Sequence, residues 1–373
     1  MLNLWRLESL WIIKMRVDFI LPRSTNVPMG GYKVVFQYAN WFAENTGDNV
    51  HIYFVINASK FSFRGIRAFT TGLIKKEKYR SISWFNISKR ITLHFDVFPE
   101  DIAKKVTSNR SKVIATHWST ATMVSDLKTS ARDKFYFIQD YEIFDPSATK
   151  EQVDETWHLD LNKIVVSHWL EKLGREMDVP TNYVPNFIDF DEFPIKTFQA
   201  TKRYRITMLW HSNPRKQSAL GLRILHRIHE EFPNMQMTVF GSNLPEGIPA
   251  YIETFSNATS AQLSEMIFSE SLVYFMPSKK EGWGLTGMEA MASGAPVVAI
   301  DNGGIWEFAE NGVSAMIVPN DEEQLYDAIL SVMKNQELQY KLSANGNEVG
   351  RRFSLEKSAN KFRNILKGDT DGI

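Results

Sequence analysis

Two carboxylates eight residues apart in a glycine-rich turn are the side chains of this sequence best suited to chemistry. Glu281 opens the turn and Glu289 follows it, within EGWGLTGMEAMASGAP. Apolar residues before the turn predict a buried strand, and the run after it predicts a helix. Glycines let backbone N–H groups approach an anion at the positive end of a helix, so this unit is typical of a phosphate site. A carboxylate at Glu289 could then accept hydrogen bonds from ribose hydroxyls, with Glu281 beside the rest of a sugar nucleotide.

Further motifs follow in fixed order up to residue 318. They are A-x-G-x-P-V-V, then G-G-x-x-E, then N-G before a short apolar strand, at Ala292, Gly294, Pro296, Gly303, Gly304, Glu307, Asn311 and Gly312. With the two glutamates, they resemble the nucleotide-sugar signature of retaining glycosyltransferases of the GT-B fold, in particular family 4. Ordered motifs of this kind are far more specific than one glycine pattern.

The resemblance implies an α/β protein with two Rossmann-like domains that face a deep interdomain cleft, and a C-terminal helix that packs back across them. It implies retaining transfer of a sugar from a UDP-hexose or dTDP-rhamnose type of donor to a glycan, glycolipid or glycoconjugate. Glu281 would hold sugar hydroxyls as a catalytic residue. The donor would be bound by Gly282, Gly284, Leu285, Thr286 and Glu289.

The first half of the chain carries candidates at the predicted strand ends. Gly30 and Gly31 follow the first strand and open a helix, where family 4 members carry a glycine pair near the donor phosphates. His117 ends another strand, where related enzymes hold a histidine beside the transferred sugar. Asp140 and Glu142, in FIQDYE, are candidate contacts to the acceptor hydroxyl. The segment HWSTA, which begins at His117, and the segment IQDYE, which contains Asp140, resemble a subgroup that contains bacterial rhamnosyltransferases of surface-glycan assembly.

The second half supplies cations for a diphosphate. Lys216 matches the lysine that neutralises the leaving group in family 4, and Arg215 is beside it. The arginine expected six residues earlier is absent, because that position is Trp210, so either Arg215 or His211 would supply the charge. Gly241 ends another strand and is a candidate donor contact.

The sequence gives little support for a metal. Asp189 and Asp191 form a D-x-D, but they lie in the expected linker rather than at a strand end. The eight histidines show no tight metal-ligand spacing. We therefore expect no cofactor and no obligatory metal, with lysine, arginine and helix N-termini stabilising the leaving group.

Composition limits the class of protein. The chain has 373 residues, 43% of them hydrophobic, and no cysteine, which favours two domains and excludes disulfides and thiolate sites. We expect residues 1–190 to form the acceptor domain, residues 191–354 the nucleotide-sugar domain, and residues 355–373 the helix that crosses back. No secretory signal or membrane span is recognisable, so a cytoplasmic protein without a nucleic-acid partner is expected.

Charge is divided unevenly along the chain. Residues 1–190 carry 25 Lys and Arg against 21 Asp and Glu, whereas residues 191–373 carry 18 against 22. Nine basic residues lie between Lys60 and Arg90 with only Glu77 as an acid, and aromatic residues alternate with them. This stretch suits either an anionic lipid surface, giving peripheral membrane contact, or an ordinary solvated loop and helix. Residues 1–14 form a further amphipathic stretch that could pack on the domain or bind an interface.

Ten short apolar runs alternate with amphipathic stretches, as in doubly wound folds. Five predicted strands lie in each half, beginning at residues 16, 51, 112, 135 and 163, and at 206, 236, 272, 296 and 315.

Two other functions remain open. One is a GT-B sugar-nucleotide epimerase, and the other is a non-catalytic GT-B partner or glycan-binding protein, which the absent arginine near Trp210 would explain.

Overall fold

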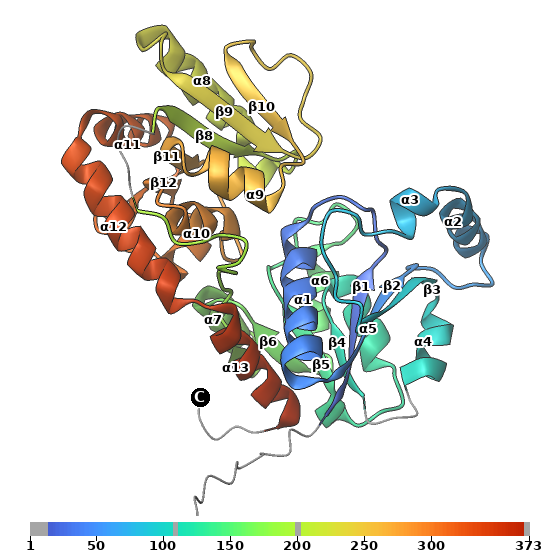
Figure 1. Ribbon diagram of the computed structural model, residues 1–373. Helices are drawn as coiled ribbons and strands as arrows, with labels where there is room; N and C mark the ends of the chain where they lie inside the picture. Colours follow the sequence, from blue (N-terminus) through green and yellow to red (C-terminus); the bar gives the residue numbers. More distant parts are fainter. Residues whose placement is uncertain (1–13, 107–110, 198–202, 369–373) are drawn as a thin grey trace, which may run out of the picture.

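The computed structural model describes residues 14–106, 111–197 and 203–368, and shows two α/β domains, each built on a parallel sheet (Figure 1). The first sheet has the order β3-β2-β1-β4-β5-β6-β7. Its strands are β1 Arg16–Pro22, β2 Asn49–Val55, β3 Thr92–Val97, β4 Lys112–Ala115, β5 Lys134–Ile138, β6 Asn162–Val165 and β7 Thr181–Tyr183. All neighbouring pairs are parallel.

The second sheet has the order β10-β9-β8-β11-β12-β13, again with all neighbours parallel. Its strands are β8 Arg205–Trp210, β9 Gln236–Gly241, β10 Ile252–Ser256, β11 Ser271–Met276, β12 Val297–Ile300 and β13 Met316–Val318. The central strands are buried along their length, as expected where helices cover both faces of a parallel sheet.

Helices connect the strands in both domains. In the first they are α1 Gly30–Trp41, α2 Phe63–Ile74, α3 Lys76–Tyr79, α4 Pro99–Val106, α5 Trp118–Ser125, α6 Lys150–Trp157 and α7 His168–Glu176. In the second they are α8 Ser218–Glu231, α9 Ser260–Gln262, α10 Leu285–Ala292, α11 Glu322–Lys334 and α12 Gln336–Arg352. Short 3₁₀ or π turns are η1 Phe42–Thr46, η2 Ala131–Asp133, η4 Pro214–Lys216, η5 Leu263–Ile267 and η6 Gly304–Glu307.

The last helix, α13 Leu355–Lys367, follows α12 and lies against the first domain (Figure 1). Phe362 is fully buried in the core of that domain, between Phe19, Tyr38 and Phe137. Arg363 donates to both oxygens of the buried Asp48 at 2.8 and 2.9 Å. The predicted helix that crosses back is therefore present, while the domain limits at residues 190 and 354 stay a prediction.

Strand order reverses at one point in each sheet. In the first, β1 has β2 on one side and β4 on the other, and in the second β8 has β9 on one side and β11 on the other. Ligands of open α/β sheets bind outside the carboxyl ends of the strands at such a switch point. The loops after β1, β4, β8 and β11 carry Gly30, His117, Lys216 and Glu281, so the topology gathers the predicted site.

The fold class predicted from the sequence is confirmed, since both domains are Rossmann-like. All ten predicted strands are present, with ends shifted by at most two residues. The predictions missed β3, β7 and β10. The amphipathic stretch predicted at residues 1–14 lies outside the described residues except for Lys14. Among the described residues, no helix is both long enough and apolar enough to cross a membrane.

Candidate active site between the two domains

The lysine and the first glutamate predicted to act on the donor form a buried ion pair. Lys216 Nζ lies 2.7 and 2.6 Å from the two carboxylate oxygens of Glu281. Burial would raise the pKa of Glu281, but the charge and hydrogen bonds of Lys216 outweigh it and hold this pKa below its ordinary value. The turn η4 that ends in Lys216 is capped by Asn213, whose side chain accepts from the Arg215 N–H at 3.1 Å.

The glycine turn between β11 and α10 reaches across to the first domain. Gly284 has φ 101° at the N-terminus of α10, in the left-handed region that glycine tolerates. A Cβ on Gly282 would lie 2.0 Å from the carbonyl oxygen of Gln139, and one on Gly30 would lie 3.4 Å from Leu285. The backbones of the two domains therefore touch at this turn. Thr286, in the first turn of α10, accepts a hydrogen bond from Tyr274 at 2.8 Å.

The second glutamate is held by a lysine of the other domain. Lys33, in the first turn of α1, lies 2.9 Å from Glu289 and 2.8 Å from Glu192. Burial raises the pKa of Glu289 despite the neighbouring Lys33. Burial would lower the pKa of Lys33, but the two carboxylates outweigh it and raise this pKa. The Lys33 side chain is only 16% exposed, so it is not a solvated surface cation.

The absent arginine at Trp210 leaves Arg215 as the second cation of the site. Arg215 forms an ion pair with Asp140 of the first domain, and its guanidinium lies 5.3 Å from the centre of the Phe144 ring. His211 directly follows β8, and its burial together with the positive charges of Lys216 and Arg215 lowers its pKa. A neutral imidazole cannot replace the missing charge, so Arg215 is the better candidate.

His117 lies in a cluster of titratable groups at the end of β4. Its side chain caps α5, and its Nε2 lies 3.4 Å from Asp145 and 3.6 Å from Glu142. Burial lowers the pKa of His117 to about 4. Burial raises the pKa of Glu142 to about 8, with Asp140 and Asp145 adding to the shift, although the Glu142 carboxylate accepts the Trp118 N–H at 2.7 Å. At neutral pH the imidazole is neutral and Glu142 holds a proton.

Two contacts between the domains had no signal in the sequence. Glu307, from the G-G-x-x-E motif, accepts from the His168 backbone N–H at 2.7 Å and lies 2.8 Å from the Nδ1 of His168. Trp169 donates its indole N–H to the carbonyl of Gly282 at 3.1 Å. The glutamate was recognised as part of a motif, but its partners lie more than a hundred residues away.

Gly241 ends β9 with its Cα against the Trp210 carbonyl, where a Cβ would lie 2.2 Å away.

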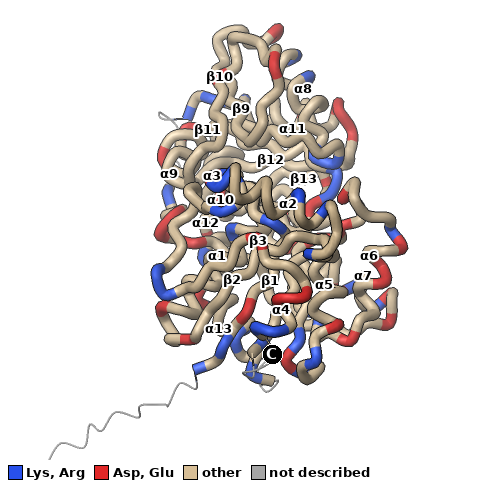
Figure 2. The backbone as a smooth tube through the Cα atoms, turned by 90° about the vertical axis from the view of Figure 1, so that its right-hand side faces the viewer, with Lys and Arg blue, Asp and Glu red and all other residues tan. Residues whose placement is uncertain are grey.

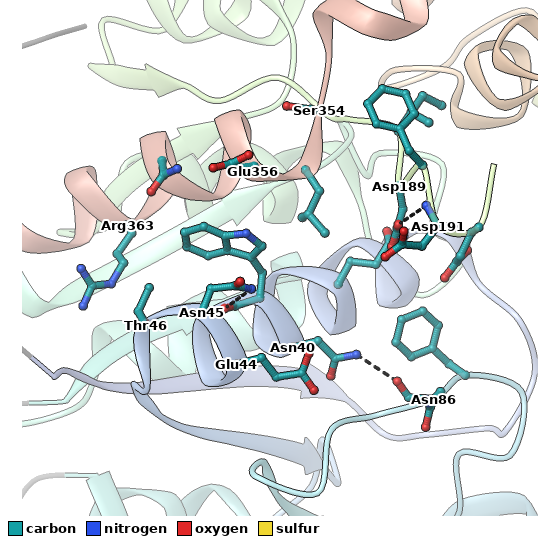
Figure 3. A pocket seen from close by; sticks show the side chains of 18 of the residues that line it. Asn40, Glu44, Asn45, Thr46, Asn86, Asp189, Asp191, Ser354, Glu356 and Arg363 are labelled. Atoms are coloured by element: carbon teal, nitrogen blue, oxygen red, sulfur yellow. Dashed lines mark hydrogen bonds between the residues drawn. The ribbon is translucent and has the colours of Figure 1, made fainter. Parts of the chain in front are cut away.

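A pocket of about 1240 Å³ lies elsewhere, between α1, the segment after β7 and α13. Figure 3 shows Asn40, Glu44, Asp189 and Glu356 among the side chains that line it. Its walls do not include Lys216 or Glu281, so it is separate from the ion pairs described above. Asp189, the first residue of the D-x-D, accepts from Gln37 at 3.3 Å. Within the three described ranges, no group of three or more His, Cys, Asp or Glu residues could hold a metal ion.

Part of the chain matches the sequence model of a known protein family. Residues 189–349 match the sequence model of a family described as "Glycosyl transferases group 1". An uncharacterized glycosyltransferase of Methanocaldococcus jannaschii is 33% identical over 97 residues, which is 26% of this chain and 28% of that protein. The phosphatidyl-myo-inositol mannosyltransferase of Mycobacterium tuberculosis is 25% identical over 201 residues, 49% of this chain and 53% of that protein. The chain thus spans about half or less of the curated relatives it matches.

The fold is shared with solved glycosyltransferase structures. An S. aureus TarM mutant in complex with fondaparinux, α-GlcNAc-glycerol and UDP superposes with a TM-score of 0.71 at 11% identity, covering 94% of this chain and 99% of that one. Identity this low shows the fold alone. The protein is therefore a GT-B protein with two Rossmann-like domains. The match to the group 1 glycosyl transferase model covers residues 189–349, which contain the two glutamates and the glycine motifs described above.

Proposed function

We propose that the protein is a retaining glycosyltransferase that moves a sugar from a nucleotide-diphosphate donor to a hydroxyl of a glycan, glycolipid or glycoconjugate. The observation that carries this proposal is the Lys216–Glu281 pair beside the glycine turn of α10. A cation, free amides at a helix N-terminus and two carboxylates meet there at the switch points of both sheets. UDP in the TarM structure is consistent with such a donor.

The donor diphosphate would take the place now filled by protein charges. Lys216 would exchange part of its contact with Glu281 for a phosphate oxygen, and Arg215 would leave Asp140 in the same way. The amides of Gly284, Leu285 and Thr286 would bind the remaining oxygens at the N-terminus of α10. Glu289 would turn from Lys33 to the ribose hydroxyls. In this proposal the ion pairs neutralise these charges before the donor binds.

The chemistry needs a stabilised leaving group and an acceptor held next to the sugar. The bond between the anomeric carbon and the phosphate oxygen breaks, a bond to the acceptor oxygen forms on the same face, and the acceptor proton passes to the departing phosphate. Lys216 and Arg215 stabilise the charge that develops on the diphosphate. Glu281 and neutral His117 bind sugar hydroxyls, and Asp140 or protonated Glu142 contacts the acceptor. No step in this scheme requires a metal or a cofactor.

Slow donor hydrolysis followed by NMR would test the proposal. We expect wild type to release the sugar from at least one of the common UDP, GDP or dTDP sugars in the presence of EDTA. The sugar that forms first should keep the donor's anomeric configuration. Lys216→Met should lose this activity, and the matched variant Lys279→Met, at an exposed lysine nearby, should keep it. Release of the opposite anomer would refute retention, and a requirement for Mg²⁺ would refute metal independence.

The place of action is part of the same proposal. A protein that acts on a lipid-linked or surface glycan needs access to it, and we propose action in the cytoplasm with peripheral contact to the membrane. The basic and aromatic stretch between Lys60 and Arg90 supports this contact.

A further inference from the structure

Large apolar side chains are exposed in one short segment of the first domain. Five of the eleven exposed large hydrophobic residues found in the described chain lie between positions 61 and 74. Phe61, Phe63 and Ile74 are 81, 82 and 82% exposed, and Ile66 and Leu73 are 53 and 43% exposed. The other six are spread over the remainder of the described ranges. A cluster of this kind marks a surface that contacts something else.

The orientation of α2 explains why these side chains face outward. Its two fully buried positions are glycines, Gly65 and Gly72, and the one large apolar side chain of the helix that packs inward is the half-buried Phe69, against Phe98. A Cβ on Gly65 would lie 2.1 Å from the Ser59 carbonyl, and one on Gly72 would lie 2.0 Å from the Asp96 carboxylate. Phe63, Ile66 and Leu73 lie on the outer side. A helix that packs on its own domain buries its large apolar side chains, whereas α2 leaves most of its own exposed.

Basic side chains surround the apolar ones. Arg64, Arg67, Lys75, Lys76 and Lys78 are exposed, and Glu77 is the one acid between positions 61 and 78. None of the five forms an ion pair with a carboxylate in the described part of the chain. We call these five and the five apolar residues the α2–α3 face. Figure 2 looks onto this side of the molecule and shows the Lys and Arg positions around α3 in blue.

The α2–α3 face is fixed to the loop that leads into the candidate active site. Arg23, just after β1, donates to Asp96 at 2.7 Å and to the Ala68 carbonyl of α2 at 2.7 Å. Asn26 donates to the Glu77 carbonyl of α3 at 2.8 Å. The same loop continues into Gly30 at the start of α1. These hydrogen bonds fix the α2–α3 face to the loop that leads into the site, so a partner that binds this face lies next to that loop.

We propose that the α2–α3 face docks on a bilayer that contains anionic lipids. The apolar side chains would enter the interface between headgroups and acyl chains, and the five cations would lie against the lipid phosphates. Charge favours this occupant over a second copy of the chain, because a two-fold contact would place five positive charges against five others. Docking would present a membrane-held acceptor to the site beside Gly30, and this part of the inference rests on the proposed function.

Vesicle sedimentation tests the inference with the full chain. Wild type should bind vesicles of phosphatidylglycerol mixed with phosphatidylcholine, bind phosphatidylcholine vesicles far less, and lose binding as salt is raised. Phe61→Ser/Phe63→Ser should weaken binding at least tenfold, since both side chains leave water on docking. Each of Arg64→Gln and Arg67→Gln should weaken it about fivefold. The matched variant Met266→Ser/Tyr340→Ser removes two exposed apolar side chains elsewhere and should bind like wild type.

Three results would overturn the inference. The first is that wild type does not bind anionic vesicles at low salt. The second is that the Phe61/Phe63 variant binds them as well as wild type does. The third is that wild type forms a dimer in sedimentation velocity and the variant does not, which would assign the face to a second copy of the chain. Calorimetric titration with UDP, GDP and dTDP in the absence of vesicles separates the two proposals. Normal nucleotide binding with no vesicle binding refutes only the docking, whereas vesicle binding without nucleotide binding refutes the function and leaves the docking supported.

Discussion

The Lys216–Glu281 pair allows a prediction that uses stability to test the geometry of the site. Lys216→Met removes the cation from both oxygens of Glu281, whose side chain is 9% exposed. Breaking a buried pair by removing one partner costs about 3–5 kcal/mol, and we expect about 3 kcal/mol because the Lys216 side chain keeps 16% exposure. For a domain of this size, that corresponds to a fall in Tm of roughly 6–12 °C.

Protonation of Glu281 decides how this loss depends on pH. In wild type the pKa of Glu281 is below its ordinary value, so the pair stabilises the fold at neutral pH and less as pH falls. In Lys216→Met the largest opposing influence is lost, and burial, which raises the pKa of a carboxyl, is then countered only by Ser278 and Arg215. The variant's deficit should therefore be largest near neutral pH and shrink toward pH 4, where Glu281 takes up a proton.

Differential scanning fluorimetry of a double-mutant cycle would measure the effect. Lys216→Met/Glu281→Gln removes both charges of this pair and should recover most of the lost Tm, because a neutral amide needs no counter-ion. Lys279→Met serves as the control for removal of a lysine. A Tm for Lys216→Met within about 1 °C of wild type, or a loss that does not change between pH 4 and 7, would refute the buried pair.

Three further predictions concern neighbouring residues. The pKa of Glu142 is raised from 4.5 to about 8, so wild type should lose free energy of unfolding as pH rises through this range, and Glu142→Gln should abolish the loss. In urea titrations the variant should be more stable than wild type by about 5 kcal/mol at pH 9 and equal to it at pH 4, and parallel pH profiles would contradict the assignment. Gly282→Ala places a Cβ 2.0 Å from the Gln139 carbonyl and should separate the domains, which small-angle scattering would detect as a larger radius of gyration; an unchanged radius would show that the turn adjusts locally. Glu289→Ala should weaken nucleoside diphosphate binding about 10–100-fold while leaving pyrophosphate binding unchanged, and equal losses for both ligands in calorimetry would contradict a ribose contact.

The fold was predictable because its signals are local. Buried parallel strands appear as apolar runs such as those at Ile206 and Val297. The glycine turn between β11 and α10 has a residue pattern of its own. The strands that were missed lie at the edges of the sheets. β3 contains His94 and Asp96, β7 has only three residues, and β10 exposes Glu253 and Thr254. None of these has the continuous apolar run by which a central strand is recognised.

The pairing of the site residues was not predictable, because it depends on contacts between segments far apart in the sequence, several of them in different domains. Lys216 and Glu281 lie 65 positions apart, and Lys33 and Glu289 lie 256 apart. Their types suggested a donor site, but only the arrangement of the two sheets places Lys33 on Glu289 and Arg215 on Asp140. The same holds for the outward face of α2. Composition showed a basic and aromatic stretch, whereas burial of Gly65 and Gly72 determines which side faces out.

Calorimetric titration of the donor site tests the central claim most directly. UDP, GDP, dTDP and their common sugars would be titrated into wild type, Lys216→Met and Lys279→Met, each with EDTA and with Mg²⁺. The account predicts that wild type and Lys279→Met bind at least one nucleoside diphosphate equally well with or without Mg²⁺, and that Lys216→Met binds it at least tenfold more weakly. Absence of binding across the panel, or equal binding by Lys216→Met, would contradict a donor site built on the Lys216–Glu281 pair.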